Sequence, residues 1–204
     1  MEIQISKLQQ NLWASCLLLA PLLIAIAQFF WHDGMVSATA GTIQVVAFTC
    51  WILAFQGMFH PLKTDLPRYA VIGFAVAVYA CIGGNNFGVD GIYAEAMGLE
   101  TLEANNQFVE KIGLPTAVYL FIPGTLFPLS LLTLGIQLLR KKKVSTLAGI
   151  LLCIGAVCFP LSRIPRIDLL AHADNLLLLV SHGLIAIELF GNKKTAANMV
   201  LTSS

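Results

Sequence analysis

Charged side chains are scarce in this 204-residue chain. Asp, Glu, Lys and Arg make up 11% of the residues, whereas 57% are apolar. A soluble globular domain carries about 25% charged residues, so this chain has too little charge to cover a water-facing surface. The net charge of +1 also lacks the basic excess that nucleic-acid binding requires. We therefore expect a membrane protein with no nucleic-acid partner.

The motifs of several enzyme and cofactor classes are missing as well. The sequence contains no HExxH motif, no GxSxG motif and no histidine box, which weighs against the common intramembrane enzymes. No lysine falls inside an apolar stretch, so a retinal Schiff base is disfavoured. Cysteines are absent from the polar segments, where disulfides and zinc sites are expected. The five that are present are predicted to be free packing residues: Cys16, Cys50, Cys81, Cys153 and Cys158.

Six apolar stretches account for most of the chain. Each is about long enough to cross a bilayer, which takes roughly 20 apolar residues in a helix. They predict one all-α transmembrane domain over residues 1–204, a bundle of six helices in a lipid bilayer. A short amphipathic helix over residues 99–112 is possible between the third and fourth stretches. The predicted spans are 12–31, 38–59, 69–84, 116–139, 144–161 and 169–190.

The distribution of lysine and arginine predicts the orientation in the membrane. Short cytoplasmic loops are enriched in these residues. With the N-terminus inside, the inner segments hold nine of them and the outer segments hold Lys111, Arg163 and Arg166. We therefore expect a plasma or inner membrane, cytoplasmic termini and an outer loop over residues 85–115. The nine inner residues are Lys7, Lys63, Arg68, Arg140, Lys141, Lys142, Lys143, Lys193 and Lys194.

Polar side chains recur along the last apolar stretch. Asp168, His172, Asn175 and His182 fall on one stripe of a helix, and Asp174 lies about a third of a turn away from it. Ionisable residues are costly in lipid, so we expect this stripe to face the bundle interior. It serves either as hydrogen-bonding contact between helices or as the wall of a polar cavity that opens outward.

Two arginines occur on the predicted outer side, where they are not expected. Arg163 and Arg166 could offer forked donors to a carboxylate or phosphate. The competing interpretation is a structural pair with Asp168, with Asp174 or with the acidic loop over residues 85–115. Weaker candidates for the polar interior come from the second and third stretches: Thr49, Gln56, His60 and Asn85.

Glycine and proline predict irregular backbone in the third and fourth stretches. Small residues at Gly73, Ala77 and Cys81 would let the third helix approach a neighbour closely. The glycines and asparagines of residues 83–86 predict that this helix ends there, either in turns or in the start of a re-entrant segment. Pro123 and Pro128, five residues apart, are expected to kink or interrupt the fourth helix.

These features leave several functions open. The first is binding or translocation of a small solute, ion or lipid, with Asp168, His172 and Asp174 able to relay protons. The alternative is a non-catalytic accessory or assembly subunit that associates with other membrane subunits or with itself. A b-type haem is less favoured, and its axial ligands would be His32 and His172, whose predicted depths agree. No other cofactor is expected, and an enzymatic activity is disfavoured without being excluded.

Overall fold

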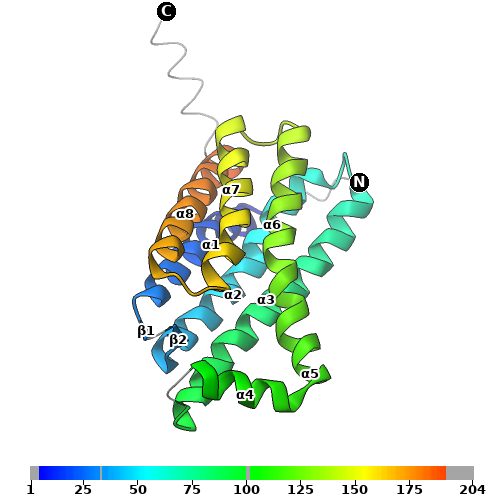
Figure 1. Ribbon diagram of the computed structural model, residues 1–204. Helices are drawn as coiled ribbons and strands as arrows, with labels where there is room; N and C mark the ends of the chain where they lie inside the picture. Colours follow the sequence, from blue (N-terminus) through cyan, green and yellow to red (C-terminus); the bar gives the residue numbers. More distant parts are fainter. Residues whose placement is uncertain (1–4, 33, 100–101, 192–204) are drawn as a thin grey trace, which may run out of the picture.

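The structure, a computed structural model, describes residues 5–32, 34–99 and 102–191. Within these ranges six helices are long and apolar enough to span a membrane, which confirms the predicted all-α fold. The span that starts at α2 continues into a 3-10 turn, η1 (His60–Leu62). The six helices, labelled in Figure 1, are α1 (Lys7–Gln28), α2 (Ala38–Phe59), α3 (Pro67–Ala96), α6 (Ile122–Arg140), α7 (Thr146–Arg163) and α8 (Asp168–Phe190).

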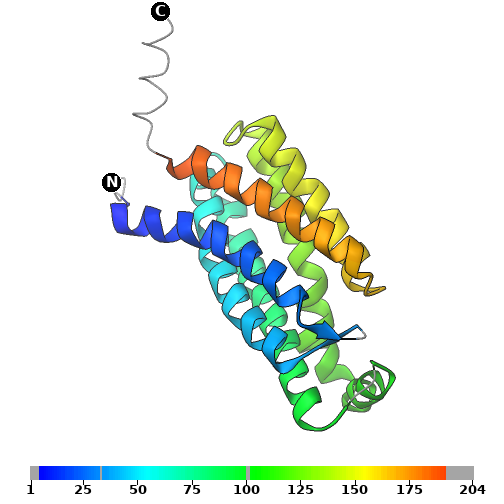
Figure 2. The same cartoon turned by 90° about the vertical axis from the view of Figure 1, so that its left-hand side faces the viewer.

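The long helices form a closed ring. Each helix packs on its neighbours in the order α1, α2, α3, α6, α7 and α8, and α8 returns to α1 (Figures 1 and 2). Short connections make sequential helices antiparallel neighbours. Aromatic side chains fill the middle of the ring, where the Trp51 and Phe127 ring centroids lie 5.1 Å apart in an edge-to-face contact. The core is therefore central, and the apolar faces turned away from it are exposed.

Exposed aliphatic side chains cover the outside of the bundle. Val71 is 67% exposed, Leu176 is 61% exposed and Ile187 is 70% exposed, although all three lie within long helices. A soluble protein seldom presents such continuous apolar surface. The outer faces therefore suit contact with lipid, as expected for a multi-pass membrane protein.

Helix α3 is longer than the sequence predicted. The expected turn at residues 83–86 and the loop that was to begin at residue 85 are both wrong, because α3 continues to Ala96. The glycines serve close packing instead. Gly84 lies against the Phe48 ring, and a Cβ on Gly88 would lie 2.7 Å from the carbonyl oxygen of Gly41 in α2. Glycine allows both a turn and a close helix approach, and here the second use applies.

The segment after α3 contains the short helix that was expected. Helix α4 covers Leu102–Ile112, and residues 100–101 lie outside the described part. Helix α5 (Leu114–Thr116) and a π-helical turn, η2 (Ala117–Phe121), then lead directly into α6. The predicted break near Pro123 therefore takes the form of a π-helical turn at the start of the fourth span.

A small hairpin between α1 and α2 was not predicted. Strands β1 (Trp31–His32) and β2 (Met35–Val36) pair antiparallel, with Trp31 opposite Val36. Gly34 in the turn has a φ of +75°, which glycine adopts without steric cost. We call the end of the bundle that carries this hairpin and the α7–α8 corner the hairpin end. The other end carries the α2–α3 and α6–α7 connections.

Polar contacts close both ends of the ring. Glu95 at the end of α3 accepts a hydrogen bond from the Ala38 amide at the start of α2 (2.6 Å). At the opposite end Glu188 accepts one from the Ser145 amide (2.6 Å), and Lys143 lies 2.9 Å from Asp65. The Lys143 ammonium lowers the pKa of the Asp65 carboxyl. Carboxylates at helix N-termini are favourable because the helix dipole is positive there.

Replacing Gly88 with alanine tests the α2–α3 contact. We expect the free energy of unfolding to fall by about 1–3 kcal/mol, because the two backbones must separate to admit the methyl group. The measurement is unfolding by increasing dodecyl sulfate in mixed micelles, followed by circular dichroism. Gly183→Ala is the matched control, since its Cβ would meet Leu18 at an ordinary 3.7 Å. Equal stability of the two variants would contradict the interpretation.

Candidate functional site

Arg163 joins three helices at the hairpin end. Its Nη1 donates to Gln28 Oε1 of α1 and its Nη2 donates to Asn175 Oδ1 of α8, both at 2.6 Å. The Gln28 amide in turn donates to Asp168 Oδ1 at 3.1 Å. The last residue of α7 is therefore bonded to the helices on either side of the α1–α8 contact. These hydrogen bonds go to amide oxygens, and no direct ion pair with Asp168 or Asp174 is seen among the described residues. The choice between the two predicted roles of this arginine therefore stays a prediction.

The same guanidinium group lies over two aromatic rings. Arg163 Cζ lies 5.4 Å from the centroid of the Trp31 ring and 5.2 Å from that of Phe159. Such cation–π contacts are strongest where water is excluded. Together with the two amide bonds they fix the orientation of the side chain.

Asp174 is the most unusual polar residue of the interior. Its exposure is 0%, and neither carboxylate oxygen has a hydrogen-bond partner among the described residues. The Ser162 hydroxyl approaches it, but that hydroxyl is placed to donate to the Phe159 carbonyl oxygen (2.9 Å). Arg163 interacts with Asp174 electrostatically, yet within the described residues no direct ion pair joins the two. The charges therefore face each other without contact.

His182 lies deeper on the same helix. Its exposure is 0%, its Nδ1 lies 2.7 Å from the Leu178 carbonyl oxygen, and its ring meets Trp51 edge to face at 4.6 Å. Nε2 of His182 and Nε1 of Trp51 have no partner in the described part of the chain. Eight residues of helix separate His182 from Asp174, or about 12 Å along the axis. Unpartnered polar atoms thus occur at two depths.

The interior face of α8 differs from the predicted stripe. Asn175 and His182 are buried as expected, but Asp168 is exposed and His172 is half-buried against the Phe29 ring, 4.7 Å between centroids. Asp174, which was placed off the stripe, is fully buried. Periodicity sets the angles between side chains, whereas packing against α1 and α7 decides which face turns inward. The buried face of α8 is therefore displaced by about one residue from the predicted stripe, toward Asp174.

Arg166 occupies a separate position on the α7–α8 corner. Its Nη1 donates to the Gly34 carbonyl oxygen of the hairpin, and its Cζ lies 5.9 Å from the Trp31 ring. Burial lowers the pKa of this guanidinium, and the Asp90 carboxylate partly offsets that effect. Arg166 thus ties the corner to the hairpin.

The weaker candidates on α2 do not join this cluster. Gln56 accepts a hydrogen bond from Trp13 Nε1 at 3.0 Å, and the His60 ring packs on the same tryptophan at 5.3 Å. The exposed Thr49 hydroxyl donates to the carbonyl oxygen of Val45, one turn earlier in its own helix. Gln56 and His60 therefore pack against α1, whereas the Thr49 hydroxyl bonds only within α2.

Asn85 and its neighbours lie against the π-helical turn. Because Pro123 has no N–H, the Tyr119 carbonyl lacks its helical donor, and the Asn86 side chain donates to it at 2.9 Å. The Ile122 amide bonds to the Ala117 carbonyl, so Val118 also loses its donor and accepts from the Tyr79 hydroxyl. Asn85 itself is half-buried and its Oδ1 has no partner within the described residues. The carbonyls freed by this break therefore bond to α3.

Sequence reasoning missed three of the residues around Arg163. Gln28 is the one polar side chain near the end of the first apolar stretch, and this position was the available signal. Trp31 and Phe159 carried no such signal, because aromatic residues near membrane interfaces are common. Only the tertiary contacts of α1, α7 and the hairpin bring the three together.

The described residues contain no group of three or more His, Cys, Asp or Glu side chains that could hold a metal ion. His32 lies exposed on strand β1, and His172 packs against Phe29. The haem ligation by these two histidines stays a prediction. All five cysteines are free, as expected.

Comparisons with protein-family models, with curated proteins and with solved structures gave no match. The site is therefore interpreted from its own geometry.

Removing either charge of the Arg163–Asp174 pair tests their coupling. We expect Arg163→Leu or Asp174→Leu to lower the free energy of unfolding by about 3–5 kcal/mol, since each leaves the other charge uncompensated. The double variant should lose less than the sum of the two. Unfolding in mixed micelles measures all three, and Arg140→Leu, at the exposed end of α6, is the control. Strictly additive losses would show that the pair is not coupled.

Proposed function

We propose that this membrane protein binds or translocates a small polar solute at its hairpin end, with Asp174 as the accepting and proton-exchanging group. The observation that carries the proposal is the fully buried Asp174 carboxylate, both of whose oxygens lack a partner among the described residues. This arrangement needs a physical explanation, because lipid and helix packing supply no hydrogen bonds to it.

Leaving such atoms unbonded is unfavourable. A buried polar group without a partner costs roughly 1–3 kcal/mol, and more if it is charged. More than nine in ten buried polar groups in native proteins are bonded to protein or to ordered water. Here Asp174, Asn175 Nδ2 and His182 Nε2, all on the interior face of α8, lack partners in the described structure. Asp174 and Asn175 lie at one depth and His182 about 12 Å deeper. Each depth therefore needs an occupant, water or solute, to satisfy its polar atoms.

The chemistry of these atoms restricts the occupant. Asp174 accepts hydrogen bonds, whereas Asn175 Nδ2 donates them. Two of the five N–H donors of Arg163 already bind amide oxygens, so this group supplies positive charge together with its remaining donors. A small uncharged or cationic solute that carries donors toward Asp174 and an acceptor toward Asn175 fits this pattern best.

His182 is a second group in the proposed pathway that could bind and release a proton. Carboxylates and histidines at successive depths are the side chains that proton relays use in transporters. The separation of about 12 Å along α8 is too long for direct transfer, so intervening water would be required. This part of the proposal depends on the unpartnered Nε2 atom of His182.

Asp174→Asn tests the proposal, because it preserves shape while removing the charge and the exchangeable proton. Purified protein is screened by thermal unfolding against small amines, amides, amino acids and polyols. We expect at least one solute to stabilise the unmodified protein, and its affinity to fall about tenfold or more in the variant, as for a hydrogen bond to a charged group. Proteoliposome uptake with an internal pH dye then follows proton movement.

Glu110→Gln is the control, since it removes the charge of an exposed carboxylate on α4 that takes no part in the Arg163 contacts. It should retain the solute effect. Equal loss in both variants would contradict a site at Asp174. If no solute stabilises the protein and it co-purifies in fixed ratio with another membrane subunit, the accessory role replaces this proposal.

A further inference from the structure

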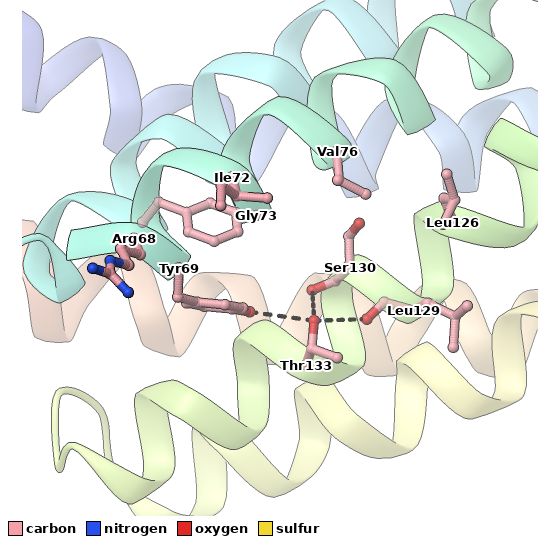
Figure 3. A pocket seen from close by; sticks show the side chains of 10 residues that line it. Arg68, Tyr69, Ile72, Gly73, Val76, Leu126, Leu129, Ser130 and Thr133 are labelled. Carbon is pink, nitrogen blue, oxygen red and sulfur yellow. Dashed lines mark hydrogen bonds between the residues drawn. The ribbon is translucent and has the colours of Figure 1, made fainter. Parts of the chain in front are cut away.

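A groove of about 430 Å³ lies between α3 and α6, in the half of the bundle near the α2–α3 connection. Figure 3 shows Tyr69 and Ile72 of α3 facing Leu129 and Thr133 of α6 across it. Ile72 is 64% exposed and Leu129 is 51% exposed, so the groove opens toward the outside of the ring. Its lining is accessible to lipid.

The groove exists because α3 and α6 are in close contact only toward the hairpin end. There a Cβ on Gly83 would lie 2.5 Å from the Pro123 side chain, and one on Gly124 would lie 2.8 Å from the Phe87 ring. In the other half the two helices are joined by the hydrogen bond from the Tyr69 hydroxyl to Thr133 Oγ1, at 3.2 Å. The space between them is thus part of the fold.

Charge and apolar surface are segregated along the groove. Arg68 lies at one end of it in Figure 3, and Val76 and Leu126 lie at the other. Arg68 is in the first turn of α3, so Ile72 and Val76 lie about 6 Å and 12 Å further along that helix. Across a membrane this places an exposed cation at headgroup level and an apolar furrow beneath it.

This arrangement matches one class of membrane component. An anionic phospholipid carries a phosphate at the interface and acyl chains directly below it. The same end of the bundle carries Arg140 and the lysines at 141–143, and such basic clusters attract anionic lipid headgroups. Lys143 is paired with Asp65, whereas Arg68 lines the groove itself.

We propose that the α3–α6 groove binds an anionic phospholipid, with its phosphate on Arg68 and one acyl chain along Ile72, Val76, Leu126 and Leu129. The proposal is independent of the Asp174 site, which lies toward the hairpin end. It explains why a groove with apolar walls has a cationic mouth.

Thermal unfolding in a neutral detergent tests the phosphate contact, with phosphatidylglycerol or phosphatidylcholine added. We expect phosphatidylglycerol to stabilise the unmodified protein more strongly. Arg68→Gln should weaken its apparent affinity about fivefold, as for the loss of one interfacial basic residue. Arg140→Gln is the control, since it removes a cation from the same end outside the groove. Equal loss in both variants would show general surface attraction and overturn the proposal.

A second pair of variants tests the acyl chain. Val76→Trp fills the groove, whereas Val71→Trp places the same ring on an exposed position, 67% exposed, outside its lining. Native mass spectrometry should show phosphatidylglycerol retained by the Val71 variant and lost from the Val76 variant. Unfolding without added lipid confirms that both are folded. Retention of phosphatidylglycerol by both variants would show that its acyl chain does not occupy the groove. Stabilisation by inorganic phosphate equal to that by phosphatidylglycerol would show that the acyl chain is not recognised. Either result refutes the groove as a lipid site.

Discussion

Lipid supplies no hydrogen bonds, and this constraint shapes every irregular part of the fold. Each polar group removed from water inside the bilayer must find its partner within the protein. The π-helical turn before α6 shows how this is met, because the carbonyls of Val118 and Tyr119 are bonded by Tyr79 and Asn86 of α3. The same requirement places Gln28 and Asn175 around the guanidinium of Arg163.

The two charged side chains of this cluster, Arg163 and Asp174, differ in how many partners their polar atoms have. Arg163 has amide acceptors at both terminal nitrogens and cation–π contacts with two aromatic rings. Asp174 is more completely buried and has no donor within the described residues. The nearest hydroxyl, that of Ser162, is placed to donate to the Phe159 carbonyl oxygen instead.

Hydropathy alone was sufficient for the number of helices and, at 38–59, for the bounds of α2. The end of α3 could not be predicted, because Gly84 and Gly88 suit a turn as well as a close helix contact, and only the position of α2 distinguishes the two. The burial of Asp174 was missed for a related reason. Helical periodicity defines which side chains share a face but not which face turns inward. The contacts of Arg163 with Gln28 and Trp31 depend on packing between segments more than 130 residues apart. The predicted orientation rests partly on Lys193 and Lys194, which lie outside the described residues.

The tightness of the ring differs between its two ends. The α1–α8 and α3–α6 contacts close the ring between helices that are not joined by a short loop. Each contact leaves a groove in the half away from the hairpin. The groove between α1 and α8, beside Leu18 and Gly183, has a volume of about 320 Å³. The groove between α3 and α6, beside Tyr69 and Thr133, has a volume of about 430 Å³. Toward the hairpin the same contacts are closed by Gln28–Asp168 and by Gly83 against Pro123. The polar groups of α8 near the hairpin therefore lie between helices in close contact, whereas the same pairs of helices leave grooves between them in the other half.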